Sequence, residues 1–154
     1  MSDLPPAYLF LDPGDSKYGG VTGWAYFDAN GDIHSMGQFH SSVSTGELQT
    51  LILPTLTLVV YEGYINAGYK TSTHAWSKNE TSQLIGKIKT LCELVNVKWA
   101  EVRNTEMSVG YAWMGMEQPK NHAISHQWDA VAHGVCWLQK NGINEAGKFL
   151  KGKT

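Results

Sequence analysis

The chain has 154 residues, of which 42% are hydrophobic and 17% are charged, and its formal net charge at pH 7 is −2. This length fits one globular domain with a substantial core and argues against a two-domain enzyme. The slightly acidic balance supplies no global basic field, so a nucleic-acid partner would have to meet locally concentrated cations.

The sequence predicts an intracellular protein without a membrane segment. It has no secretory h-region at the N-terminus, and its longest apolar stretch, residues 51–61, is interrupted by Pro54 and is too short to cross a bilayer. Cys92 and Cys136 both fall in segments predicted as helices. Reduced thiols are the simplest interpretation of these cysteines.

The first part of the chain alternates short apolar runs with turn residues. The run Tyr8–Leu11 predicts a strand that stops at Asp12-Pro13-Gly14, because Pro and Gly force a turn. Two alternating segments around Asn30-Gly31 predict a hairpin, since this pair suits positive φ angles. The predicted elements are strands at Thr22–Asp28 and Ile33–Phe39, a short helix at Thr45–Leu53 ended by Pro54, and a buried strand at Thr57–Tyr61 closed by Glu62.

The second part contains two long helical patterns. Between Ser77 and Val95 the apolar residues recur three and four positions apart, which is typical of an amphipathic helix. Val97–Val102 predicts a fifth strand, Arg103–Pro119 a connection without a clean period, and Ala123–Lys140 a final helix. The order predicts a mixed α/β layer protein with one domain over residues 1–146 and a flexible basic tail at 147–154.

Three carboxylates stand where ionised groups are costly. Asp12 and Glu62 each close an apolar strand, and Asp129 lies among apolar residues of the last helix. A charge near a core needs a cation or hydrogen-bond donors, and no Lys or Arg lies nearby in sequence. A divalent metal is the partner that this pattern suggests.

The same residues carry a resemblance to a known family. The chain resembles the RuvC family of Holliday-junction resolvases, within the RNase H-like superfamily, over nearly its whole length. The resemblance implies an RNase H-like mixed five-stranded sheet flanked by helices, with metal ligands at Asp12, Glu62, His126 and Asp129. It is carried by Asp12-Pro13-Gly14, Thr22-Gly23-Trp24-Ala25, Glu62, Trp76-Ser77-Lys78-Asn79 and the helical run from His126 to Ala132.

This resemblance implies a metal-dependent nuclease that cuts four-way DNA junctions as a homodimer. Hard oxygen ligands suit Mg²⁺ or Mn²⁺, and Asp12 can bridge two ions roughly 3.5 to 4 Å apart. Such ions activate water and stabilise the leaving oxygen, and Lys120 is the candidate for an assisting lysine. The stripe Leu84, Ile88 and Leu91 is either the dimer face or part of the core.

A DNA-binding surface is predicted mainly in the segment that follows Glu62. Aromatic side chains there can stack on unpaired bases, and lysines can follow phosphates. In resolvases a side chain just after the glutamate wedges near the junction centre, a place that Tyr64 or Ile65 takes here. The predicted contacts are Tyr64, Ile65, Tyr69, Lys70, Trp76, Lys78 and Lys87, to which Lys17, Lys89, Arg103 and Lys120 add if they fold to one face.

Simpler structural roles compete with each assignment. Asp12 can be a turn former, and Glu62 a charge that reaches solvent at a strand end. Asp129 can be a first-turn acid after a Ser125 cap, favoured by the helix dipole. His126 and, more so, His133 can be hydrogen-bonded structural histidines, although both share a helix face with Asp129.

Other functions are also compatible with this fold. A less selective RNase H-like nuclease on branched DNA, flaps or RNA-DNA hybrids would use the same carboxylates, whereas a non-catalytic nucleic-acid-binding member would lack at least one of them. Actin-like sugar kinases and ATPases share the Asp-x-Gly turn and hairpin. They need a second domain with its own phosphate loop, for which this chain is too short.

Overall fold

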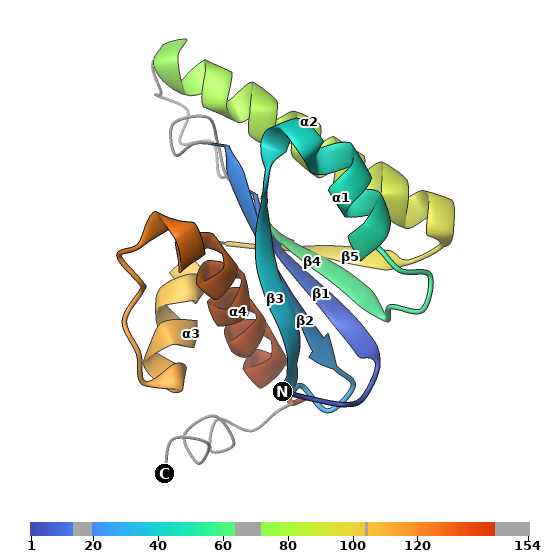
Figure 1. Ribbon diagram of the computed structural model, residues 1–154, viewed down its shortest axis with the longest axis vertical. Helices are drawn as coiled ribbons and strands as arrows, with labels where there is room; N and C mark the ends of the chain where they lie inside the picture. The colour runs from blue at the N-terminus through green and yellow to red at the C-terminus, as the bar shows by residue number, and fades with distance from the viewer. Residues whose placement is uncertain (14–19, 64–71, 104, 144–154) are drawn as a thin grey trace.

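The structure, a computed structural model, describes residues 1–13, 20–63, 72–103 and 105–143, with the side chains of 72–80, 105 and 106 outside the description. Five strands form one sheet in the order β3-β2-β1-β4-β5 (Figure 1). The strands are β1 (Pro6–Asp12), β2 (Val21–Asp28), β3 (Ile33–His40), β4 (Leu58–Glu62) and β5 (Lys98–Val102). All five were predicted from the sequence.

The sheet is mixed, which confirms the predicted fold class. β1, β2 and β3 pair antiparallel, whereas β4 lies parallel to both β1 and β5. The turn between β2 and β3 is the predicted hairpin: the carboxylate of Asp28 accepts hydrogen bonds from the backbone of Asn30 and Asp32, and Gly31 has a φ of 82°. Gly31 alone supplies the left-handed conformation that this connection needs, since Asn30 does not have a positive φ.

Helices cover both faces of the sheet. α1 and α2 pack on one face, while α4 crosses the other with α3 packed against it (Figure 1). The bounds are α1 (Ser44–Leu51), which follows the 3₁₀ turn η2 (Ser41–Val43), α2 (Ser72–Val95), α3 (Thr105–Met114) and α4 (His122–Lys140). The result is a three-layer α/β protein with a core on each side of the sheet.

Strand alternation decides which side chains face which layer. Leu9 and Leu11 of β1 point into the core under α1 and α2, whereas Phe10 points into the core under α4. On β4, Tyr61 and Val60 divide in the same way. Because successive side chains alternate, the last residues of β1 and β4 continue the row that faces α4.

The segment predicted as an irregular connection, Arg103–Pro119, contains the helix α3 instead. Its inward positions are spaced three and four apart at Met107, Gly110, Tyr111 and Met114. A Cβ atom at Gly110 would lie 1.9 Å from the carbonyl oxygen of Ala132, so glycine permits α3 to approach α4 closely. The expectation of a loop here was wrong because Met, Gly and Tyr carry the period in place of large aliphatic residues.

The apolar stripe of α2 belongs to the core. Leu84 is 5% exposed and Ile88 0%, and Leu91 packs against the same cluster. The interpretation of these three residues as a dimer face is therefore wrong. Cys92 and Cys136 are both buried, and neither forms a disulfide within the described part of the chain. No helix in the described part of the chain is long and apolar enough to span a membrane. The predicted tail at 147–154 lies outside the described residues, and the domain boundary stays a prediction.

Replacing Ile88 by alanine tests the packing of α2. Ile88→Ala removes a fully buried side chain and should lower the free energy of unfolding by about 2–4 kcal/mol. Leu94→Ala is the matched control on the same helix, because Leu94 is 76% exposed, and should change it by less than about 0.5 kcal/mol. Denaturant unfolding measures both, and equal effects would contradict this packing of α2.

Candidate metal centre

Two carboxylates meet at the ends of adjacent parallel strands. Leu11 of β1 pairs with Tyr61 of β4, so the residues that follow them, Asp12 and Glu62, lie side by side. Both continue the row of side chains that faces α4, and the interaction with Glu62 contributes to the raised pKa of Asp12. The parallel pairing of the first and fourth strands thus brings these two acids together.

α4 brings two histidines to these carboxylates. His126 and His133 are seven residues apart, two turns along the helix, and share one face of it. The Nδ1 atom of His126 lies 3.9 Å from Oδ2 of Asp12, and Nε2 of His133 lies 3.3 Å from Oε2 of Glu62. Each strand-end acid is thus matched with one imidazole, although the sequence had favoured only His126.

Glycine at position 23 lets α4 come this close to the sheet. Gly23 of β2 is paired with Asp12, and a Cβ atom there would lie 1.8 Å from the carbonyl oxygen of His126. The side chain of Gln38 on β3 also ties down the start of α4, since it donates to the carbonyl of His122 and accepts from the amide of Gln127. The position of His126 therefore depends on the backbone packing of three elements.

Asp129 is held by donors that the sequence did not reveal. The hydroxyl of Tyr111 on α3 donates to Oδ1 of Asp129 over 2.6 Å. The amide of Gln118, in the connection between α3 and α4, donates to both carboxylate oxygens at 2.9 and 3.1 Å. The inward period of α3 could have indicated Tyr111, but no local signal identifies Gln118.

The first-turn interpretation of Asp129 is wrong. α4 begins at His122, and its N-cap is Asn121, whose side chain accepts from the amide of Ala123. Asp129 therefore lies about two turns into the helix, where it is 6% exposed. A dipole effect limited to the first turn does not reach this position.

Burial and mutual proximity make these carboxyl groups hard to ionise. Burial of Asp12, together with a hydrogen bond and the charge of Glu62, raises its pKa from an ordinary 3.8 to about 7. Burial, and next the charge of Asp12, also raise the pKa of Asp129, against the opposing hydrogen bonds from Tyr111 and Gln118. Among the residues that the structure describes, no lysine or arginine forms an ion pair with any of these acids.

The donor set fits a divalent cation. Ligand atoms of Asp12, His126 and Asp129 all lie within 4.8 Å of one another, and so do those of Asp12, Glu62 and His133. A cation would offset the carboxylate charges that otherwise lack a basic partner, and carboxylate oxygens are the ligands that Mg²⁺ and Mn²⁺ prefer. The structure thus brings together all four ligands expected from the resemblance and adds His133.

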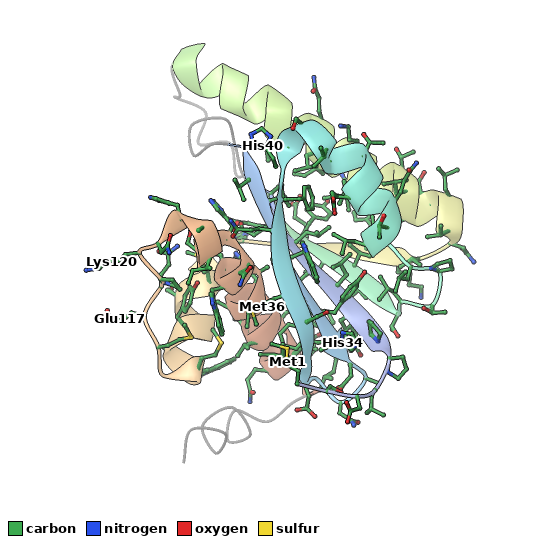
Figure 2. All side chains as sticks on the ribbon, in the orientation of Figure 1. Met1, His34, Met36, His40, Glu117 and Lys120 are labelled. Carbon is green, nitrogen blue, oxygen red and sulfur yellow. The ribbon has the colours of Figure 1, made fainter. Side chains whose placement is uncertain are left out.

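The predicted assisting lysine is placed differently from the acids. Lys120 is exposed, and Figure 2 shows it at the outer edge of the connection between α3 and α4, pointing away from the sheet. The polar group that this connection extends to Asp129 is the amide of Gln118. The assisting role of Lys120 stays a prediction.

Most of the predicted DNA-binding residues lie outside the description. Tyr64, Ile65, Tyr69, Lys70 and Lys17 are not among the described residues, and of Trp76 and Lys78 only the helical backbone is described. Lys87 donates to the hydroxyl of Ser44 on α1, whereas Lys89 lies 4.8 Å from the ring of Trp99 on β5. These two lysines therefore contact elements on different sides of α2, and a groove lined by the basic residues stays a prediction.

The order and pairing of the strands, with helices on both faces, define an RNase H-like α/β fold. Among solved structures, this chain is similar to T. thermophilus RuvC in complex with a Holliday junction substrate, with a TM-score of 0.62 and 12% identity. A structure of Thermus thermophilus RuvC alone gives a TM-score of 0.58 at 12% identity. Each comparison covers 88% of this chain and 96% of the other. No family model and no curated protein matches the sequence.

Alanine at position 23 should disrupt the centre. In Gly23→Ala the new Cβ atom meets backbone of α4, which must shift, so we expect a loss of about 1–3 kcal/mol in stability and weaker Mn²⁺ binding. Gly46→Ala is the control: Gly46 lies in α1 with nothing within 4 Å, so alanine should stabilise by about 0.5–1 kcal/mol. Calorimetry measures both quantities, and unchanged binding in Gly23→Ala would contradict the close approach.

The stability of the metal-free protein should depend on pH through Asp12. Its carboxyl group holds a proton more tightly in the folded than in the unfolded chain, so its contribution is present below about pH 4 and is lost as the pH rises through about 7. The free energy of unfolding of Asp12→Asn, relative to that of the native chain, should therefore rise by about 2–4 kcal/mol between pH 4 and pH 8. Thermal unfolding with a chelator measures this difference.

The exposed Asp32 provides a matched control for the pH experiment. Asp32 lies in the hairpin between β2 and β3, and Asp32→Asn should differ from the native chain equally at both pH values. Adding Mn²⁺ at pH 8 should raise the unfolding temperature of the native chain and leave that of Asp12→Asn nearly unchanged. A difference for Asp12→Asn that does not vary with pH would mean that this carboxylate is well solvated.

Proposed function

We propose that this protein is a divalent-metal-dependent endonuclease that resolves four-way DNA junctions by paired phosphodiester hydrolysis. The observation that carries the proposal is the convergence of Asp12, Glu62, His126 and Asp129 at one edge of an RNase H-like sheet. The sequence resemblance implies a metal-ligand role for each of these residues. A non-catalytic member of the fold would have no need to retain this full set of acids.

Within this proposal Asp12 is the central ligand, because both donor groups contain it. His126 and Asp129 complete one group from α4, and Glu62 belongs to the other. Mg²⁺ or Mn²⁺ held by these residues would supply an activated water and would offset negative charge on the scissile phosphate. Tyr111 and Gln118 fix the orientation of the Asp129 carboxylate, so this ligand needs little rearrangement when a cation binds.

Branched DNA is the proposed substrate, and a homodimer the proposed assembly. The fold is similar to that of a RuvC solved in complex with a Holliday junction substrate. Two symmetric nicks require two active sites, which a pair of identical chains related by a two-fold axis provides. The buried stripe of α2 is unavailable for this contact, so another surface must form the interface.

A comparison of substrates tests the proposal. We expect the chain with Mg²⁺ or Mn²⁺ to place symmetric nicks in a four-way junction and to cut a flap, a linear duplex and an RNA-DNA hybrid at least about tenfold more slowly. Denaturing gels with each strand labelled in turn map the cuts. Preference for the flap or the hybrid would favour a less selective RNase H-like nuclease, and no cleavage of any substrate would contradict the proposal.

Substitutions in the acids separate chemistry from binding in the same assay. Asp12→Asn, Glu62→Gln and Asp129→Asn should each lower cleavage by about 10²-fold or more, since each removes a charged ligand. Junction binding without metal should persist or tighten, because less negative charge lies near the phosphates. Asp32→Asn, on the exposed hairpin, should cleave like the native chain. Loss of both binding and folding in the acid variants would point to structural roles.

A further inference from the structure

His133 is a buried residue of the candidate metal centre, and its side chain contacts that of Glu62. It lies one turn after Asp129 on α4, so both side chains point toward the ends of β1 and β4. Its side chain is 1% exposed, compared with 21% for that of Glu62. The 3.3 Å contact between Nε2 of His133 and Oε2 of Glu62 therefore joins a buried imidazole to a partly exposed carboxylate.

The spacing of these atoms suits ligands of one ion. Donors around an octahedral cation, each about 2.1 Å from it, lie about 3 Å apart when adjacent and about 4.2 Å apart when opposite. The separation of 3.3 Å between His133 and Glu62 is near the first value. Asp12 offers a third donor within 4.8 Å of both. The three residues thus form a second group, parallel to that of Asp12, His126 and Asp129.

We propose that His133 is the nitrogen ligand of a second cation position, formed with Asp12 and Glu62, and that it makes this position selective for Mn²⁺ over Mg²⁺. Imidazole nitrogen suits borderline transition metals, whereas Mg²⁺ strongly prefers oxygen ligands and keeps its water. Because each group contains an imidazole, both positions should bind Mn²⁺ more tightly than Mg²⁺. The inference rests on the proposed nuclease function, because it concerns the same metal centre.

A glutamine substitution can distinguish a metal-ligand role of His133 from a role that only orients Glu62. Glutamine at position 133 has an amide at nearly the reach of Nε2, so it can still donate to the carboxylate of Glu62. It offers a metal only an oxygen, however, and so removes the nitrogen donor. Under the proposal His133→Gln keeps the local packing and loses the preference for Mn²⁺, whereas an orienting role would leave this preference unchanged.

Metal binding without DNA provides the test. We expect titration calorimetry of the native chain to give two Mn²⁺ ions, and electron paramagnetic resonance to give the signal of a spin-coupled pair. In His133→Gln the ratio of Mn²⁺ to Mg²⁺ affinity at the weaker position should fall about tenfold or more. In His133→Leu one Mn²⁺ should be lost and the remaining signal should be that of an isolated ion.

His122→Gln is the matched control, because His122 is exposed at the start of the same helix and only its backbone is tied to Gln38. It should bind two Mn²⁺ ions with native affinities. If His133→Leu does not fold, as circular dichroism would reveal, the affinity ratio of His133→Gln decides the matter. If neither folds, pulsed electron paramagnetic resonance of the native chain decides it: we expect Mn²⁺ to couple to two imidazole nitrogens, and coupling to only one would overturn the proposal.

The outcomes separate this inference from the proposed function. A single Mn²⁺ in the native chain, or a native affinity ratio in folded His133→Gln, would overturn the role of His133 and leave a one-ion nuclease intact if the junction is still cut. Absence of Mn²⁺ binding together with absence of cleavage would overturn both. Two Mn²⁺ ions without cleavage of any nucleic acid would leave the cation position standing and remove the nuclease proposal.

Discussion

The parallel pairing of β1 with β4 is the constraint on which the rest of the centre depends. It sets Asp12 beside Glu62 in a place where both face the helix α4, and burial there raises the pKa of Asp12 to about 7. Two neighbouring carboxyl groups in a partly buried site cannot both ionise cheaply. Imidazoles from α4 lie next to both acids, at 3.9 Å from Asp12 and 3.3 Å from Glu62. Among the described residues no lysine or arginine takes this place. Imidazoles can turn to a cation as neutral ligands, which a lysine cannot do at ordinary pH.

Close backbone packing fixes the positions of the helices that carry these side chains. Gly23 lets α4 lie directly against β2, and Gly110 lets α3 lie directly against α4. Both contacts position the centre, because α3 carries Tyr111, which donates to Asp129, and α4 carries Asp129 and the two histidines. Side chains at either glycine would move a helix and not merely a neighbouring side chain, since the atoms that they meet belong to the backbone. The relative positions of the side chains in the centre therefore depend on how the sheet, α4 and α3 pack on one another.

The sequence predicted the sheet and most of the centre because their signals are local and repeat with a clear period. Apolar runs that end in Asp12 and Glu62 identify strand ends, and the spacing of His126 and Asp129 identifies one face of a helix. α3 escaped notice because its inward positions are Met, Gly and Tyr, and with it the donors to Asp129 were missed. His133 was undervalued because a lone histidine in an apolar helix is ordinarily structural, and only the position of Glu62 shows what it contacts. Whether the basic residues line one groove stays a prediction: Lys87 and Lys89 lie two residues apart on α2 and contact different elements, α1 and β5.

Asp129 and Glu62, the two carboxylates near Asp12, differ in how firmly their side chains are held. On one side Asp129 accepts hydrogen bonds from Tyr111 and Gln118 and is 6% exposed. On the other side Glu62 ends its strand, keeps 21% of its side chain exposed and contacts His133 and Asp12. A ligand that is already fixed loses little freedom when a cation binds, whereas a more exposed one must be ordered in that step. If the centre binds cations as we propose, the Asp129 side is the better ordered position. Occupancy of the Glu62 side would then respond more strongly to the identity of the cation and to the side chain at position 133.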